Sequence, residues 1–166
     1  MFFLRKNVRY LTHGAILAAA YAALAHLQNL LLPGSASMAI QFRVAEALCV
    51  LAFLTPAAVP GLTVGCFLFN VTSGAVLPMD FLVGSFATFL ATGCMWKLRR
   101  FPWLGAMMPA LWNALLVGWE LAVCIGGGFW INALYVAIGE VAVLYVLGMP
   151  LYHAVKKHGR LFLTKN

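Results

Sequence analysis

The acidic residues of this chain stand in unusual surroundings, because all four lie in or beside long apolar stretches. They are Glu46, Asp80, Glu120 and Glu140. An ionisable side chain in hydrocarbon costs about 2.5–3.5 kcal/mol on insertion scales, so each of these residues needs a compensating role. A buried carboxylate can accept hydrogen bonds from a polar ligand, carry a proton or pair with a cation.

Two pairs of polar residues occur at helical spacing. Asn113 and Glu120 are seven residues apart, and Asn132 and Glu140 are eight apart. Both spacings place the two side chains close to one face of a helix. Any one of these residues is equally well explained by a structural hydrogen bond between helices. The whole set, which gathers toward the outer half of the bundle, instead indicates a ligand pocket open to the outside.

Further polar residues lie at the same depth. Arg43 and Glu46 are three residues apart, and we expect them to pair, which lowers the cost of both charges. Trp119 precedes Glu120 and offers a ring for stacking on a flat ligand, although tryptophan is also typical of membrane interfaces. The candidate ligand-binding residues are Glu46, Asn70, Asp80, Asn113, Trp119, Glu120, Glu140 and Arg43.

The elements that position these residues are apolar helices. The chain has 166 residues, of which 64% are hydrophobic and 9% are charged. Soluble domains have about 45–50% apolar and about 25% charged residues, so an ordinary cytosolic domain is excluded. We expect an all-α integral membrane protein whose single domain spans residues 1–166. The apolar segments cover residues 11–32, 45–59, 61–76, 81–96, 109–125 and 129–152.

The basic residues predict the topology. Ten of the eleven fall in three clusters within residues 5–9, 97–100 and 156–165, each beside an apolar segment. This is typical of cytoplasmic loops, and we therefore expect no binding of nucleic acid. If all three clusters are cytoplasmic, an even number of membrane crossings must separate the first cluster from the second. Segments 11–32 and 81–96 supply two crossings, so residues 45–76 must cross twice, with breaks at Pro56, Pro60 and Gly61. We predict six transmembrane helices in a compact bundle in the cell membrane, with both termini cytoplasmic.

Small residues form a stripe on the first predicted helix. Ala15, Ala19 and Ala23 recur every four residues, with Gly14 and Ala18 beside them. Such a stripe lets two helix backbones approach closely in a membrane. The partner is either a helix of the same bundle or another protein.

Motifs for catalysis and nucleotide binding are absent from the sequence. It contains no phosphate-binding Gly-x-x-x-x-Gly-Lys-Ser/Thr loop, no Gly-x-Ser-x-Gly and no His-Glu-x-x-His. The four cysteines are spread over separate segments, as expected of small buried side chains rather than metal ligands. We therefore expect binding or transport, with no catalytic residue, no metal and no cofactor in this chain.

Several segments resemble a known family. The stretch from Ile40 to Asn70 reads IQFRVAEALCVLAFLTPAAVPGLTVGCFLFN, and further matches begin at Asp80, Pro109 and Gly139. Together they resemble the QueT family, the substrate-binding S components of bacterial energy-coupling-factor transporters for queuosine precursors. The resemblance extends from Leu11 to Leu151.

The resemblance implies that a 7-deazaguanine-type base is captured outside and released inside. It also implies partners, namely a transmembrane coupling subunit and two ATPase subunits that use ATP. The first-helix positions that match the docking stripe are Ala15, Ala19 and Ala23.

Roles for the candidate residues follow as hypotheses. A guanine-like edge presents adjacent N–H donors that one carboxylate accepts together, which suits Glu120 or Glu46. Asp80 or Glu140 would make a second polar contact. The remaining roles are orientation of the base by Asn70 and Asn113, and stacking by Trp119.

Other functions fit the same composition. One is an S component for a different vitamin-like compound, and another is a stand-alone proton-coupled carrier that titrates Glu140 or Glu120. A membrane enzyme or assembly factor has the weakest support. Copurification with ATPase subunits, or transport that depends on the proton gradient alone, would separate these alternatives.

Overall fold

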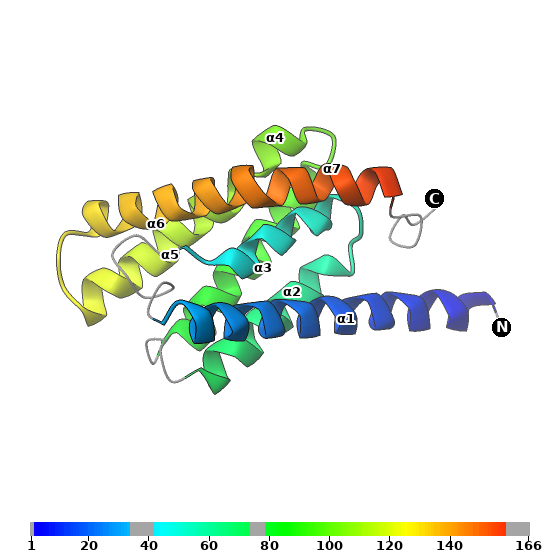
Figure 1. Ribbon diagram of the computed structural model, residues 1–166, viewed down its shortest axis with the longest axis horizontal. Coiled ribbons are helices and arrows are strands. Elements are labelled where there is room, and N and C mark those ends of the chain that lie inside the picture. Colours follow the sequence, from blue (N-terminus) through cyan, green and yellow to red (C-terminus); the bar gives the residue numbers. More distant parts are fainter. Residues whose placement is uncertain (1, 34–41, 74–78, 159–166) are drawn as a thin grey trace.

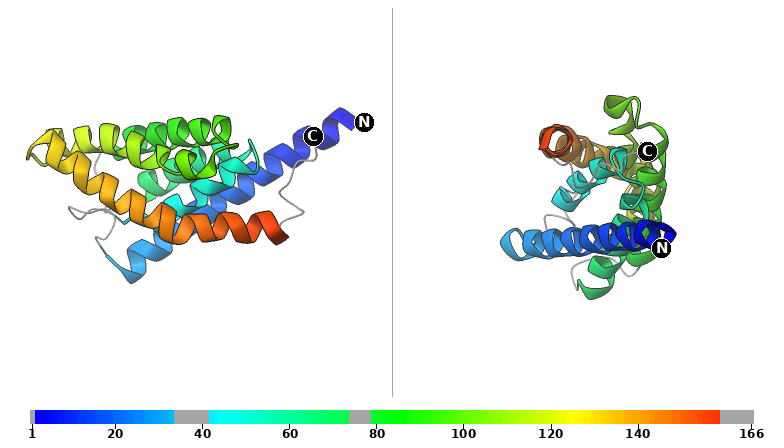
Figure 2. Two further views of the ribbon diagram at one scale, coloured as in Figure 1. Left: turned by 90° about the horizontal axis from the view of Figure 1, so that it is seen from above. Right: turned by 90° about the vertical axis from the view of Figure 1, so that its right-hand side faces the viewer.

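The structure of the chain, a computed structural model, describes residues 2–33, 42–73 and 79–158. Within these ranges every regular element is helical, which confirms the predicted all-α architecture. Helix α1 (Phe2–Leu31) begins at the end of the bundle where α7 (Met149–His158) finishes, as Figure 1 shows. Figure 2 shows the same placement from two further directions. The start of α1 and the end of α7 therefore lie at the same end of the bundle, which agrees with an even number of membrane crossings.

Apart from α4, which lies between the predicted segments 81–96 and 109–125, the other elements correspond to the predicted apolar segments. In chain order they are η1 (Val44–Phe53), α2 (Ala58–Thr72), α3 (Asp80–Lys97), α4 (Pro102–Gly105), α5 (Met108–Cys124), α6 (Phe129–Val143) and η2 (Leu144–Gly148). Three helical stretches among the described residues are long and apolar enough to cross a membrane: Asn7–Leu31, Pro102–Cys124 and Phe129–His158. Helices η1 and α2 are shorter apolar helices.

The predicted boundary between the second and third segments is wrong. The break was expected to include Pro60 and Gly61, but α2 begins at Ala58 and contains both residues. Proline is tolerated in the first turn of a helix, because the amide hydrogen it lacks would have no partner there. The chain turns instead at residues 54–57, around Pro56. Residues 74–76 of the third predicted segment lie outside the described residues.

Helix η1 is a 3₁₀-helix of ten residues, which is long for this type. Three residues per turn bring Glu46, Cys49 and Ala52 into one row, and all three are buried. A neighbouring row packs tightly on η2, since a Cβ atom at Gly148 would lie only 2.8 Å from the Val50 side chain. A narrow helix with a glycine opposite it therefore brings Glu46 into the centre of the bundle.

The last predicted segment is one continuous helical stretch, called here the last rod, formed by α6, η2 and α7 (Figure 1); the left view of Figure 2 shows that it bends along its length. Its middle part, η2, is a π-helical turn just before Pro150. A proline inside a helix removes one hydrogen bond and clashes with the carbonyl four residues earlier. The wider π turn provides room for that mismatch, so the rod bends but stays helical throughout.

Helices α1 and α2 pack closely through small residues. A Cβ atom at Gly61 would lie 2.6 Å from the Gly14 carbonyl oxygen, and one at Gly65 would lie 2.7 Å from the Ala18 carbonyl oxygen. The row of α1 that contains Gly14 and Ala18 therefore serves contacts within the bundle. The predicted docking stripe is a separate row, and its members are all exposed: Ala15, Ala19 and Ala23.

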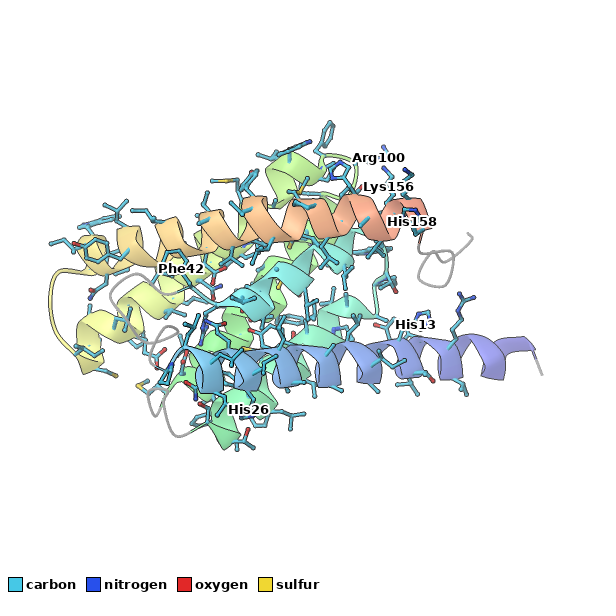
Figure 3. The ribbon with its side chains drawn as sticks, in the orientation of Figure 1. His13, His26, Phe42, Arg100, Lys156 and His158 are labelled. Carbon is cyan, nitrogen blue, oxygen red and sulfur yellow. The ribbon has the colours of Figure 1, made fainter. Side chains whose placement is uncertain are left out.

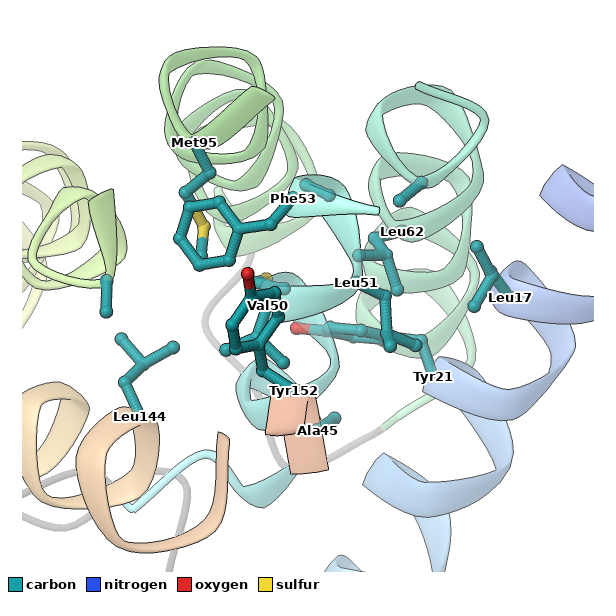
Figure 4. Close-up of a cluster of buried hydrophobic side chains, with 14 of the residues drawn as sticks. Leu17, Tyr21, Ala45, Val50, Leu51, Phe53, Leu62, Met95, Leu144 and Tyr152 are labelled. Atoms are coloured by element: carbon teal, nitrogen blue, oxygen red, sulfur yellow. The ribbon is translucent and has the colours of Figure 1, made fainter. Parts of the chain in front are cut away.

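The largest hydrophobic core cluster lies where α1, η1, α2, α3 and the last rod meet (Figure 4). Labelled members include Leu17, Val50, Leu62, Met95 and Leu144. The Tyr21 ring reaches into this cluster from α1. The core therefore fixes α1 and η1 against the rest of the bundle.

Basic side chains lie at one end of the bundle. Arg100, Lys156 and His158 lie at the end where α1 begins, whereas Phe42 and His26 lie toward the other end (Figure 3). The placement of Arg100 and Lys156 at one end matches the topology that the basic clusters predict.

Candidate functional site

The buried polar side chains gather from five elements of the bundle. All four acids are buried, with Glu46, Glu120 and Glu140 at most 1% exposed. They come from η1, α3, α5 and α6, and α2 adds an amide. The buried members of the predicted set are Arg43, Glu46, Asn70, Asp80, Asn113, Glu120 and Glu140.

Arg43 pairs with Asp80, not with Glu46 as the three-residue spacing suggested. Its Nη2 atom lies 2.9 Å from Asp80 Oδ2. The prediction is wrong because Arg43 has a non-helical backbone (φ −91°, ψ 86°) just before η1, so helical spacing does not apply to it. Asn70 Nδ2 donates to the Asp80 carbonyl oxygen at 2.8 Å, which joins α2 to the start of α3.

Glycine at position 84 makes this arrangement possible. A Cβ atom there would lie 2.8 Å from Asp80 Oδ1, 3.0 Å from Asn70 Nδ2 and 3.4 Å from Arg43 Nη1. The three polar groups therefore converge on the backbone of α3, where a larger residue would push them apart. The sequence analysis did not identify Gly84, because a glycine within an apolar helix carries no chemical signal of its own.

Glu46 is held by hydrogen bonds from its surroundings. Its Oε1 atom accepts from the Tyr21 hydroxyl at 2.5 Å, and Thr88 Oγ1 lies 3.4 Å from the same oxygen. Its Oε2 atom accepts from Cys49 Sγ at 3.0 Å. Both carboxylate oxygens thus have protein partners. Tyr21 and Thr88 were missed by the sequence analysis, although a tyrosine within the alanine-rich first helix was a usable signal.

Asn113 and Glu140 connect α5 to α6. Asn113 Nδ2 donates to Glu140 Oε1 at 2.9 Å, and both side chains are buried. The second oxygen of each group, Asn113 Oδ1 and Glu140 Oε2, has no hydrogen-bond partner among the described residues. This pair of side chains therefore carries two buried acceptor oxygens that no described residue satisfies.

Glu120 differs from the other acids. Neither of its carboxylate oxygens has a hydrogen-bond partner among the described residues, although the side chain is fully buried. It interacts electrostatically with Asp80 and Arg43. Glu140 interacts in the same way with Glu46 and Arg43. Arg43 therefore links the four acids into one electrostatic cluster.

The model of the QueT transporter family matches residues 11–157 of the chain. The chain belongs to the QueT transporter family. The comparisons with curated proteins and with solved structures found no match. The chain is a member of the QueT transporter family, and its described residues include three helices long and apolar enough to cross a bilayer, so it is a membrane protein. Every residue of the buried polar cluster lies within the matched range.

The unpartnered atoms of this QueT family member indicate what the cluster can do. Burying a polar group without a hydrogen bond costs roughly 1–3 kcal/mol by mutational data, and native proteins leave few such groups. Here several occur among the buried residues that also form the Arg43–Asp80 and Asn113–Glu140 pairs, and Glu120 has no hydrogen-bond partner among the described residues. A polar ligand that supplies the missing partners would remove this cost. The arrangement is therefore suited to holding a polar small molecule inside an apolar bundle.

Trp119 is not brought into this cluster. Its side chain is 48% exposed, whereas that of the neighbouring Glu120 is fully buried. Consecutive residues of a helix point about 100° apart, so the helix face that buries the acid leaves the indole outside. The exposed position suits the membrane interface.

The described residues contain no group of three or more His, Cys, Asp and Glu side chains placed to hold a metal ion. Of the four cysteines, Cys49 and Cys66 are buried, and Cys49 is occupied as a donor to Glu46.

Proposed function

We propose that this QueT family member is the S component of an energy-coupling-factor importer. It captures a 7-deazaguanine-type base, a queuosine precursor, from outside the cell and passes it inward. The observation that carries the proposal is the cluster of buried carboxylate and amide atoms without protein partners within the family match. A flat base with many N–H groups supplies the missing donors.

The exposed stripe on α1 supports a role for partner subunits. Ala15, Ala19 and Ala23 leave one face of α1 flat and exposed, next to the row that packs on α2. Small residues at a helix surface favour close helix contacts in a membrane. In this proposal the face docks a transmembrane coupling subunit, and two ATPase subunits supply energy from ATP.

The proposed location is the plasma membrane of a bacterium, with several crossings and both termini in the cytoplasm. The shared position of Arg100 and Lys156 at one end of the bundle supports this orientation. The polar cluster would then open toward the outside, since Asn70 and Glu120 lie near the ends of α2 and α5.

Titration of the purified full-length protein with queuine, 7-cyano-7-deazaguanine and 7-aminomethyl-7-deazaguanine tests the binding function. We expect saturable binding of at least one of these bases, and no binding of unrelated vitamins such as riboflavin or biotin. Binding of a vitamin in place of the bases would overturn the proposed substrate class.

Affinity purification of the tagged chain from its own membranes tests the partners. We expect a coupling subunit and two ATPase subunits to copurify, and uptake of the base to require ATP. Uptake by the chain alone in proteoliposomes, driven by a proton gradient, would instead show a stand-alone carrier.

A further inference from the structure

The unpartnered atoms of the buried cluster are mostly acceptors. Among the described residues, six unpartnered buried side-chain atoms are acceptor oxygens and two are donor nitrogens. The acceptors are Asn70 Oδ1, Asp80 Oδ1, Asn113 Oδ1, Glu120 Oε1, Glu120 Oε2 and Glu140 Oε2. The donors are Arg43 Nη1 and Trp112 Nε1, the second from a half-buried side chain that is not a member of the cluster defined above. A ligand that satisfies this set must offer many more donors than acceptors.

The buried charged groups are likewise mostly acidic. Four carboxyl groups are buried, whereas Arg43 is the one buried Lys or Arg among the described residues. Arg43 is already paired with Asp80. A buried carboxylate without a counter-charge is strongly unfavourable, so a cationic ligand would stabilise this cluster more than a neutral one.

We infer that the site selects bases that carry an amine cation, and that Glu120 accepts the ammonium group. This inference rests on the proposed function and names the form of the base. The other acids are less available: Glu46 has partners on both oxygens, and Asp80 and Glu140 each have a partner on one. Glu120 alone among them has two open oxygens.

The guanine-like edge of the base, which is not the part that Glu120 binds, has acceptors of its own. Asn113 and Glu120 are seven residues apart on α5, which separates them by about 10 Å along the helix. The open oxygens of Asn113 and Glu140 suit the adjacent N–H groups of a guanine-like edge. Arg43 interacts electrostatically with both Glu120 and Glu140, and its open Nη1 is a donor that suits the ring carbonyl oxygen of the base.

This arrangement separates two forms of the base. In 7-aminomethyl-7-deazaguanine the substituent is a cationic donor, which forms charge-assisted hydrogen bonds with a carboxylate. In 7-cyano-7-deazaguanine the substituent is a neutral acceptor, which would face the two open oxygens of Glu120. The structure thus assigns the base edge to Glu140 and Asn113, and the substituent to Glu120.

Calorimetric titration of the purified wild-type protein with three bases tests the inference. They are the 7-aminomethyl, 7-cyano and 7-hydroxymethyl forms of 7-deazaguanine, the last being a neutral substitute of similar size. We expect the aminomethyl form to bind at least about tenfold more tightly than either neutral form. This comparison needs no variant, so it does not depend on whether a variant folds.

Two isosteric variants then locate the effect. Glu120→Gln should weaken binding of the aminomethyl base about tenfold or more and leave the cyano base unchanged or tighter. Glu140→Gln should weaken both bases to a similar extent, because it alters the shared edge. Glu120→Asp retains the charge and should keep most of the preference.

The outcomes distinguish the inference from the proposed function. Equal or tighter binding of the neutral bases by the wild-type protein would overturn the inference and leave the proposed function standing. An equal loss of both bases in Glu120→Gln, at an unchanged melting temperature, would also overturn it. Failure of the wild-type protein to bind any of these bases or queuine would instead remove the proposed function.

Discussion

The Tyr21 hydroxyl donates a hydrogen bond of 2.5 Å to Glu46 and thereby joins α1 to η1 inside the bundle. Tyr21 is 2% exposed and Glu46 is fully buried. The same helix presents Ala15, Ala19 and Ala23 on its exposed face. One helix thus carries both the proposed partner surface and a direct contact to an acid of the polar cluster.

Removing this hydroxyl should destabilise the fold. Tyr21→Phe leaves Glu46 Oε1 with only the long contact to Thr88, so we expect a loss of about 1–3 kcal/mol in the free energy of unfolding. Thermal unfolding of the detergent-solubilised protein measures it. Tyr10→Phe, on the same helix, is the matched control, because the Tyr10 hydroxyl makes only an exposed 3.4 Å contact with the Pro56 carbonyl oxygen and should matter little. Equal melting temperatures for both variants would contradict the structural role of Tyr21.

The close contact between α1 and α2 should not tolerate a methyl group. Gly61→Ala places a Cβ atom 2.6 Å from the Gly14 carbonyl oxygen, and the resulting separation of the helices should destabilise the protein by about 1–3 kcal/mol. Gly93→Ala is the control, since nothing lies within 4 Å of a Cβ atom there. That change should be neutral or stabilise α3 by about 0.5–1 kcal/mol. A stable Gly61→Ala protein would show that the two helices pack less closely.

The buried ion pair between Arg43 and Asp80 should behave as a coupled unit. Either Arg43→Gln or Asp80→Asn alone leaves an uncompensated charge and should destabilise the fold by about 3–5 kcal/mol. The double variant should cost clearly less than the sum of the two. A cycle of Arg43→Gln with Glu46→Gln should show weaker coupling. Stronger coupling of Arg43 to Glu46 than to Asp80 would reverse the assigned pairing.

Two adjacent alanines on α1 should respond differently to a larger side chain. Ala19→Leu enlarges an exposed position, so we expect normal stability and base binding but a loss of partner copurification. Ala18→Leu enlarges a position that is 7% exposed and packs against Gly65, so it should destabilise the protein itself. Partner association that survives Ala19→Leu would place the docking surface elsewhere.

The orientation of the bundle can be tested with cysteine labelling. Cys124 is exposed at the end of α5, which we expect to face outside. A membrane-impermeant maleimide should label it in intact cells, whereas a Lys157→Cys variant lacking Cys124 should react only after the cells are opened. The buried Cys49 and Cys66 should not react in the folded protein. Labelling of residue 157 in intact cells would reverse the topology.

The amino-acid composition and the spacing of residues along the chain were sufficient to predict much of the architecture. An apolar chain with few charges has to form helices that satisfy their own backbone hydrogen bonds in lipid, so the all-helical fold and the approximate positions of the helices follow from the sequence alone. The four acids could be singled out for the same reason, since carboxylates are costly in an apolar surrounding. Glu46, Asp80, Glu120 and Glu140 are indeed all buried.

The tertiary structure decided which of these groups meet. Sequence spacing suggested Arg43 with Glu46, but the chain around Arg43 is not helical and its partner Asp80 comes from another helix. Contacts such as Tyr21 with Glu46, or Asn113 with Glu140, join residues 25 and 27 positions apart, and no local pattern encodes them. The burial of these residues follows from the apolar composition, which the sequence carries. Whether a buried polar atom has a hydrogen-bond partner depends instead on which side chains other helices bring within hydrogen-bond distance.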